Sequence, residues 1–178
     1  TVGGGGHAEG ILAASAPTGS LLGLDRDPEA VEAANRRLAS VGMRATLMHS
    51  SFVDMAYYVQ DMGWDLVDGI LLDLGVSSRQ LEQGRRGFSF VREGPLDMRF
   101  DQSSGVKAAE IVNRWSQNEI AQLLSELGEE RQGKMIAQAM VQERPIDSTL
   151  ELARIVAELK SKKKGRRHAA TKTFQALR

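Results

Sequence analysis

A run of four glycines near the start of the chain constrains its fold more than any other feature. Residues 3–6 stand between the end of an expected strand and residues 7–14, which have helical spacing. Glycine in that place allows a sharp turn and lets a ligand approach the backbone closely. Asp25 follows about 20 residues later, at the end of the apolar run 21–24, where a carboxylate can accept hydrogen bonds from ribose hydroxyls. The glycines and Asp25 together predict a site for a ribose-bearing cofactor.

The glycine run does not identify the cofactor by itself. Gly3, Gly5 and Ala8 also satisfy the dinucleotide fingerprint G-x-G-x-x-A, so a nicotinamide-dependent oxidoreductase is a competing interpretation. A glycine-rich turn beside a solvated Asp25 is the purely structural alternative. His7 opens the expected helix, and we favour a role for its backbone N–H in the cofactor site over a role for its imidazole.

Residues 1–73 alternate between strand and helix patterns, which is typical of parallel strands joined by right-handed crossovers. Expected strands cover residues 21–24, 44–48 and 67–72, and expected helices cover residues 28–40 and 53–62. Asp73 ends the most apolar of these strands, and ligands in open α/β sheets bind beyond strand ends of this kind. We expect Leu72 and Leu74 to bury its carboxylate, which then needs a partner or caps the next turn. Phe52 is a candidate for stacking on an adenine, with core packing as the favoured alternative.

The pattern changes in the second half of the chain. Residues 74–105 are rich in Gly, Ser, Arg and Asp without a periodic element, and a loop of this length inside a compact domain is usually functional. Residues 106–160 have helical spacing throughout, with capping boxes at Ser116 and Ser148. We expect three to four helices that form a subdomain inserted after the third strand. The basic run 160–168 is either a phosphate-binding loop or a solvated charge run.

Composition excludes several classes of protein and site. Lys plus Arg and Asp plus Glu both number 23, so the net charge is zero and any nucleic-acid-binding surface must be local. The absence of cysteine excludes disulfides and cysteine-based zinc sites, and we expect no metal. No apolar run approaches the roughly 20 residues of a membrane-spanning helix, and the start has no signal-peptide pattern. We expect a cytoplasmic protein, and we expect this chain to be part of a longer one.

Three long motifs in the middle of the chain are recognisable as a set. They are Leu71-Leu72-Asp73-Leu74-Gly75-Val76-Ser77-Ser78-x-Gln80-Leu81, Arg86-Gly87-Phe88-Ser89-Phe90 and Gly94-Pro95-Leu96-Asp97-Met98-Arg99. They are accompanied by Gly5-Gly6-His7, Asp25-Arg26-Asp27-Pro28, Gly128-Glu129-Glu130 and residues 171–178. With these motifs in this order, essentially the whole chain closely resembles the small-subunit (16S) ribosomal RNA cytosine-N4 methyltransferases, the RsmH or MraW family.

The resemblance implies a fold and an activity. The fold is the α/β sheet of a class I, Rossmann-like S-adenosylmethionine methyltransferase, incomplete in this chain, with an inserted all-helical subdomain. The implied organisation is residues 1–105 as the N-terminal part of the methyltransferase domain, 106–160 as the helical insertion, and 161–178 as a basic loop and the return to the first domain. The implied reaction moves a methyl group from S-adenosylmethionine to the exocyclic N4 of a cytidine in the decoding region of 16S rRNA, with the small ribosomal subunit as partner.

The resemblance also implies roles for individual residues. The implied cofactor contacts are Gly5, Gly6 and His7 at the methionine end, Asp25 at the ribose, Phe52 at the adenine, and Asp73 and Gln80 as further contacts. An aspartate expected two places before Thr1, and the strands expected after Arg178, are not in this sequence. We therefore expect a lone chain of this length to be poorly stable and inactive.

Methyl transfer to N4 needs an acceptor for the amine proton, because the N4 lone pair is delocalised into the ring. Asp73 is our hypothesis for this role and Asp97 is the second candidate, with a local salt bridge to Arg99 as the structural alternative for Asp97. Phe88 and Phe90 lie among arginines in the sequence. This pattern suits a loop that holds a nucleobase flipped out of the RNA stack. Closure of both rings onto the core is the alternative. A non-enzymatic RNA-binding or ribosome-assembly module remains a further alternative function.

Overall fold

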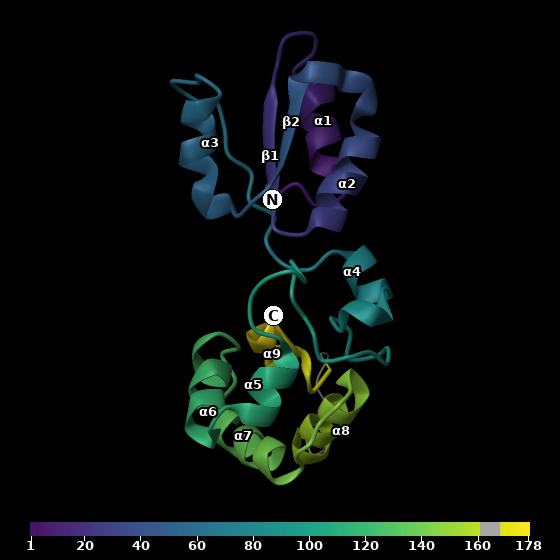
Figure 1. The fold of residues 1–178 in the computed structure, drawn as a ribbon, viewed down its shortest axis with the longest axis vertical. Helices are drawn as coiled ribbons and strands as arrows, with labels where there is room; N and C mark the ends of the chain where they lie inside the picture. The colour runs from purple at the N-terminus through teal and green to yellow at the C-terminus, as the bar shows by residue number, and fades with distance from the viewer. Residues whose placement is uncertain (161–167) are drawn as a thin grey trace. The chain divides into compact units, whose positions relative to one another are not determined.

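The computed structural model describes residues 1–160 and 168–178, which form two compact units (Figure 1). The N-terminal unit comprises Thr1–Gly75, and the C-terminal unit comprises Val76–Arg178. The N-terminal unit is mixed α/β, whereas the regular elements described in the C-terminal unit are helical. Most of the predicted basic run, residues 161–167, lies outside the described residues.

The N-terminal unit is built around two parallel strands, β1 (Leu21–Asp25) and β2 (Ala45–His49), paired from Leu21 opposite Ala45 to Asp25 opposite His49. Its helices are α1 (Gly6–Ala14), α2 (Pro28–Arg37) and α3 (Met55–Asp61), with 3-10 turns at Ala39–Arg44 (η1) and Phe52–Asp54 (η2). Figure 1 shows α1 and α2 on one side of the strands and α3 on the other. The predicted strands at 21–24 and 44–48 are confirmed as β1 and β2, with β2 one residue later.

Local chemistry explains where α2 begins. The Asp27 side chain accepts a hydrogen bond from the Glu29 N–H at 3.0 Å, and Pro28 stands at the first helical position, where its missing N–H costs nothing. Arg36 and Arg37 in the last turn face the negative end of the helix dipole. The helix ends earlier than predicted, at Arg37. The core of this unit lies between α1, α2 and the strands and consists of Val2, Ala8, Leu12, Val31, Ala34 and Leu38.

The predicted strand at residues 67–72 is wrong, because residues 64–77 contain no strand. Ile70, Leu71 and Leu72 are 64%, 50% and 46% exposed. A strand requires a neighbouring backbone to complete its hydrogen bonds. β1 pairs with β2, and the β1 carbonyl of Leu24 accepts a hydrogen bond from the Val2 N–H at 2.9 Å. The apolar run therefore has no ladder partner among the described residues and stays irregular and exposed.

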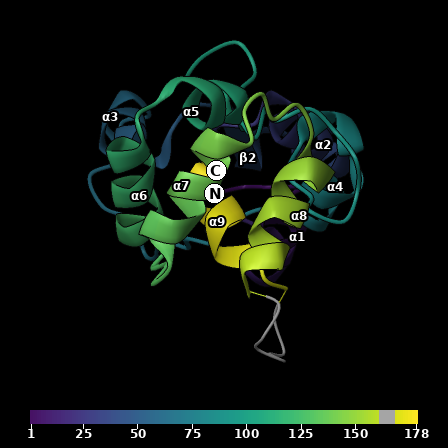
Figure 2. The ribbon, with the colours of Figure 1, turned by 90° about the horizontal axis from the view of Figure 1, so that it is seen from below.

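The C-terminal unit is formed by short helices around one core. Its elements are α4 (Ser78–Glu82), η3 (Gly84–Arg86), α5 (Ala108–Arg114), α6 (Gln117–Glu126), α7 (Gly133–Gln142), α8 (Thr149–Lys160) and α9 (Thr171–Leu177). α7 packs against α5, α6 and α8, and α6 packs against α9 (Figure 2). Within the described part of the chain, no helix is long and apolar enough to cross a membrane.

Capping determines where two of these helices begin. Ser116 and Glu119 form the predicted capping box at the start of α6, each side chain accepting a hydrogen bond from the other residue's backbone N–H. At α8 the Ser148 hydroxyl accepts from the Glu151 N–H at 3.2 Å, but the Glu151 carboxylate accepts from the Asp147 N–H instead of completing the box. The predicted helices between residues 106 and 160 are confirmed as α5 to α8.

The segment between α4 and α5 is packed into the C-terminal unit. Phe88, Leu96 and Met98 are at most 2% exposed. The Thr149 hydroxyl donates to the Arg92 carbonyl at 2.8 Å, so the start of α8 holds the segment directly. The compact units divide at Gly75, and the domain boundaries expected at 105/106 and 160/161 stay predictions.

Candidate cofactor and proton-transfer site

The four glycines form the turn that leads into α1. Gly5 has φ 83, and a Cβ on it would lie 3.2 Å from the Ala34 backbone, so both its conformation and the neighbouring α2 require glycine. A Cβ at Gly4 would meet nothing within 4 Å. The turn is therefore tight against α2 on one side and open on the other, where a ligand can approach the backbone.

Asp25 ends β1, and its carboxylate bridges two backbone segments. One oxygen accepts a hydrogen bond from the Gly3 N–H and the other accepts from the Asp27 N–H, both at 2.9 Å. The residue is 9% exposed. A carboxylate oxygen has two acceptor positions, so each oxygen retains capacity for a second donor. The structure thus places the predicted ribose-binding residue directly beside the predicted glycine turn.

Asp73 also lies at the start of α1. Its Oδ2 is 3.6 Å from Nδ1 of His7, and its backbone carbonyl accepts a hydrogen bond from the Thr1 hydroxyl at 2.5 Å. The side chains of His7 and Asp73 are 65% and 66% exposed, so the expectation that Asp73 is buried is wrong. Its apolar neighbours are exposed because no strand covers them among the described residues. The imidazole of His7, for which we favoured no role, is the group that faces the carboxylate.

Phe52 follows β2 at the same strand end. It begins η2 and is half-buried, and the Ser51 hydroxyl caps this turn by accepting from the Val53 N–H at 3.4 Å. His49, at the end of β2, is paired with Asp25 in the ladder. Neither hydrophobic core cluster of the described residues includes Phe52. Phe52 therefore lies toward the end of the sheet that carries Asp25.

Gln80, in the C-terminal unit, has a structural role that the sequence analysis missed. Its side-chain oxygen accepts a hydrogen bond from the Ser77 N–H at 2.9 Å, and the Ser77 hydroxyl accepts from the Gln80 N–H at 3.3 Å. This is a complete capping box for α4, and the spacing S-x-x-Q was its signal. Gln80 is 7% exposed, so the box holds a buried amide at a fixed position.

Asp97 is bound to Arg99 rather than open to a ligand. The two carboxylate oxygens each accept a hydrogen bond from the guanidinium at 2.9 Å, and the Arg99 N–H adds a third at 3.2 Å. Burial by itself raises the pKa of Asp97. The hydrogen bonds from Arg99 and the charges of Arg99 and Lys107 outweigh burial and hold that pKa below its ordinary value. The bidentate geometry is that of a strong ion pair, with the side chains only 12% and 15% exposed.

Arg86 is a second residue that the sequence analysis missed. It is 2% exposed, and one guanidinium nitrogen donates to the carbonyls of Arg99 at 3.2 Å and Phe100 at 2.8 Å. Its guanidinium also lies 5.5 Å from the centre of the Phe88 ring. A buried arginine is uncommon without partners of this kind. Arg86 therefore joins the two ends of the segment that contains Asp97.

The two aromatic candidates for holding a base differ. Phe88 is fully buried and belongs to the core of the C-terminal unit. Phe90 is half-buried, stacks on His168 with ring centres 4.5 Å apart and planes at 9°, and meets Phe174 edge to face. Core packing thus accounts for Phe88, and contacts within the unit already engage the ring of Phe90.

The two described ends of the basic run, Lys160 and His168, are engaged within the C-terminal unit. Lys160 pairs with Glu130, a residue of the Gly128-Glu129-Glu130 motif, and donates to the Ala169 carbonyl at 2.8 Å. The two paired side chains are 17% and 5% exposed, so this ion pair is largely buried. The ammonium group of Lys160 is therefore committed to the protein. No group of three or more His, Asp or Glu side chains in the described residues could hold a metal ion.

The sequence profile of the MraW methylase family matches residues 1–178. The chain belongs to the MraW methylase family. The resemblance drawn from the motifs is therefore confirmed.

Three curated relatives of this MraW family member carry the same name. The chain is 49% identical to the ribosomal RNA small subunit methyltransferase H of Geobacter sp. (strain M21), 50% identical to that of Syntrophotalea carbinolica and 49% identical to that of Thermomicrobium roseum. Each match covers all of this chain and 59%, 58% and 56% of the respective relative. The chain thus spans less than two thirds of the length of the relatives it matches.

Proposed function

We propose that this chain provides the cofactor site of an S-adenosylmethionine-dependent enzyme that methylates the exocyclic N4 of a cytidine in 16S rRNA. The observation that carries the proposal is the glycine turn with Asp25 bonded to it, in a chain that belongs to a methylase family. The name of its relatives supports small-subunit ribosomal RNA as the substrate. The small ribosomal subunit is the proposed partner, and the cytoplasm is the proposed location.

The residues at the turn fit the cofactor. The open side of the turn at Gly4 leaves room for a ligand against the backbone, and Asp25 has acceptor capacity for a ribose hydroxyl. We assign Gly5, Gly6 and His7 to the methionine end, Asp25 to the ribose and Phe52 to the adenine. Asp73 and Gln80 complete the proposed contacts.

The proposed fold of the complete enzyme extends the two strands. β1, β2, α1 and α2 are consistent with the start of a class I, Rossmann-like methyltransferase sheet. We propose residues 1–105 as the N-terminal part of that domain, 106–160 as an inserted helical subdomain and 161–178 as the return to it. A sheet of this kind would give the exposed apolar run before Asp73 the neighbour that it lacks among the described residues.

The chemical task of the protein is to make N4 a nucleophile. S-adenosylmethionine, when bound, supplies a methyl group on a positively charged sulfur. As the N4–CH3 bond forms, the bond between that methyl group and sulfur breaks and its electron pair goes to sulfur, and the exocyclic nitrogen must lose a proton. We propose that the Asp73 carboxylate orients the amine by accepting a hydrogen bond from it and then takes the proton. Its high exposure in this chain leaves the carboxylate accessible to a substrate amine.

Asp97 is less suited to the same task. Both of its oxygens accept from Arg99, and its lowered pKa makes it a poorer proton acceptor. We therefore propose that Asp97 anchors Arg99 and the segment around it, and that Asp73 receives the proton.

The test uses an enzyme that contains this sequence and has the full length of its relatives. It is incubated with methyl-labelled S-adenosylmethionine and unmodified small ribosomal subunits, and the RNA is digested to nucleosides. Label in N4-methylcytidine is the expected result. No label, from a folded protein that binds the cofactor, contradicts the proposed substrate, and affinity for a nicotinamide dinucleotide instead would favour the oxidoreductase.

Replacing Asp73 with Asn tests the proton acceptor. Asn keeps the shape and the acceptor oxygen but cannot take the proton at neutral pH, so we expect cofactor affinity to change little and kcat to fall about 100-fold or more. Asp147→Asn, at an exposed carboxylate in the C-terminal unit, is the control and should leave kcat unchanged. Turnover of Asp73→Asn at the normal rate with normal cofactor binding contradicts the assignment.

A further inference from the structure

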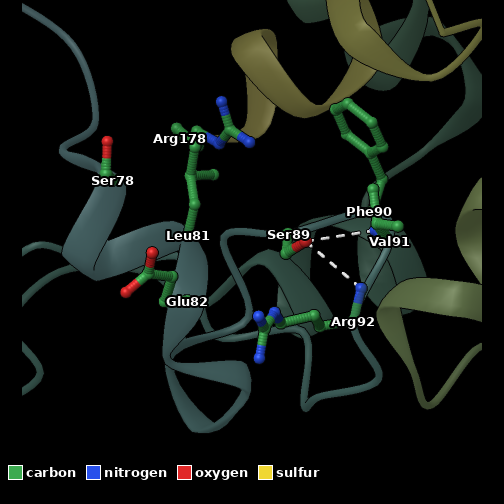
Figure 3. A pocket seen from close by; sticks show the side chains of 8 residues that line it. All are labelled: Ser78, Leu81, Glu82, Ser89, Phe90, Val91, Arg92 and Arg178. Carbon is green, nitrogen blue, oxygen red and sulfur yellow. Dashed lines mark hydrogen bonds between the residues drawn. The ribbon is translucent and has the colours of Figure 1, made fainter.

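A cavity of about 420 Å³ lies within the C-terminal unit (Figure 3). Its walls come from α4, from the segment after η3 and from the end of α9. The lining residues are Ser78, Leu81, Glu82, Ser89, Phe90, Val91, Arg92 and Arg178. Small-molecule sites in proteins usually have roughly 300–1,000 Å³, so the space is sufficient for a ligand of the size of a nucleotide.

Arg178 gives the cavity a cation that has no counter-ion among the described residues. One guanidinium nitrogen donates to the Phe88 carbonyl, while Nε is buried and has no hydrogen-bond acceptor in the described part of the chain. Burial lowers the pKa of Arg178, which means that its charged form is poorly solvated. A partly buried charge in this state is stabilised by an anionic ligand.

Arg92 places a second guanidinium at the same cavity from a fixed backbone. The Ser89 hydroxyl accepts hydrogen bonds from the N–H groups of Val91 and Arg92 at 3.1 and 3.2 Å, as the dashed lines in Figure 3 show. The Arg92 carbonyl is held by Thr149. The Arg92 side chain itself is exposed and makes no ion pair with a described residue. The backbone of Arg92 is therefore held in place, while its guanidinium is available to a ligand.

Glu82, on the α4 wall of the cavity, adds a carboxylate, which favours a hydrogen-bond donor on the ligand. It is exposed, lines the cavity and forms no ion pair in the described ranges 1–160 and 168–178. A carboxylate accepts hydrogen bonds from an exocyclic amino group, as it does from N4 of cytosine. An inorganic anion would satisfy the arginines but not Glu82. A ligand with both a phosphate and an amino-bearing base satisfies all three.

We propose that this cavity binds one nucleotide of the RNA strand that carries the target, with its phosphate at Arg178 and Arg92 and the amino group of its base at Glu82. The identity of RNA as the ligand rests on the proposed function. The binding itself involves no methyl transfer. Gln80, a proposed cofactor contact, lies on the same short helix as Glu82.

The first experiment measures binding of small probes to the full-length enzyme saturated with S-adenosylhomocysteine, which keeps nucleotides out of the cofactor site. Cytidine 5′-monophosphate, uridine 5′-monophosphate, cytidine and inorganic phosphate are titrated by NMR. We expect cytidine monophosphate to bind about tenfold more tightly than cytidine, because of the charged hydrogen bonds to phosphate, and more tightly than the other two probes.

Matched variants locate the site. Arg92→Gln should remove most of the advantage of cytidine monophosphate over cytidine, and since Arg92 is exposed this change does not threaten folding. Arg178→Gln should do the same, with circular dichroism as the check on its fold. Arg114→Gln, at an exposed arginine outside the cavity, should bind like the unaltered enzyme. Glu82→Gln should reduce the preference for cytidine over uridine monophosphate.

Longer RNA provides an independent readout. For a single-stranded RNA, the slope of log affinity against log salt should become shallower by about 0.7 for each phosphate that the protein no longer neutralises. We expect this change in Arg92→Gln and Arg178→Gln but not in Arg114→Gln.

Four outcomes of these experiments decide the proposal. Equal binding of cytidine and its monophosphate, or equal behaviour of the three arginine variants, overturns it. Inorganic phosphate binding as tightly as the nucleotide overturns the assignment of the base. If the probes bind as expected while no N4-methylcytidine forms, the cavity is retained and the proposed reaction fails.

Discussion

Residues 66–74 and residues 84–105 behave in opposite ways. The first segment is the most apolar part of the chain, and its large apolar side chains lie 40% or more exposed. The second segment is rich in glycine and arginine, yet Arg86, Phe88 and Met98 within it are almost completely buried. Hydrophobicity alone would have predicted the reverse.

The difference shows what each segment needs in order to be ordered. An apolar run forms a strand only beside another backbone, and the described residues provide none for 66–74. The second segment carries its own partners, because Arg86 bonds two carbonyls near its far end and Asp97 binds Arg99. Contacts with the start of α8 complete its packing. Specific polar contacts can therefore order a chain that has few apolar residues.

The largest expected difference in the free energy of unfolding is between alanine variants at two glycines, one in each segment. A Cβ at Gly87 would lie 2.0 Å from the Pro95 carbonyl at a φ of 71, so Gly87→Ala should lower the free energy of unfolding of the C-terminal unit by about 4 kcal/mol. Gly69→Ala is the matched control, since its Cβ would meet nothing within 4 Å, and should change stability by less than about 0.5 kcal/mol. Urea unfolding followed by circular dichroism measures both. Similar values for the two variants would remove the contrast between the segments.

Replacing Arg86 tests whether its hydrogen bonds order the second segment. Arg86→Met keeps much of the side-chain volume but leaves the carbonyls of Arg99 and Phe100 without this donor, so we expect the free energy of unfolding to fall by about 3 kcal/mol. Amide hydrogen exchange should also become faster around residues 86–100. The exposed Arg114→Met should show neither change. Unaltered exchange in Arg86→Met would mean that apolar packing alone orders the segment.

The Asp97–Arg99 pair predicts a dependence of stability on pH. Because the folded protein holds the pKa of Asp97 below its ordinary value of about 3.8, the stabilisation is present above that value and is lost as the pH falls through the lower, folded pKa. Asp97→Asn should therefore cost about 1–2 kcal/mol at pH 7, and the difference from the unaltered protein should shrink as the pH falls below about 3.8. The exposed Asp147→Asn provides the control. A difference that is constant from pH 7 to pH 3 would exclude the ion pair as its cause.

The smallest expected effect lies in the apolar run. Leu71 is half exposed, so Leu71→Ala should change the stability of this chain by less than about 0.5 kcal/mol, whereas Leu96→Ala, at 2% exposure, should cost about 3 kcal/mol. Thermal unfolding of both variants measures the contrast. A cost above about 2 kcal/mol for Leu71→Ala would show that a neighbouring backbone covers the run in solution.

Much of the N-terminal site was predictable because its signals are local. The glycine turn, Asp25 at a strand end and the start of α2 at Asp27 and Pro28 each depend on residues close together in the sequence. The capping box of Gln80 was equally local and was overlooked within a stretch expected to be irregular. The buried state of Arg86 could not be predicted, since its acceptors on Arg99 and Phe100 are separated from it by irregular chain.

The sequence by itself determined the family, the positions of β1, β2 and most helices, and the residues gathered at the glycine turn. Only the tertiary structure decided that the run before Asp73 is exposed, that Asp97 is neutralised by Arg99, and that Phe88 is buried while Phe90 lies at a cavity. Caps and turns are satisfied by groups a few residues away, so the sequence specifies them directly. Burial and strand pairing require backbone and side chains from distant parts of the chain, and their outcome depends on which of those parts come together.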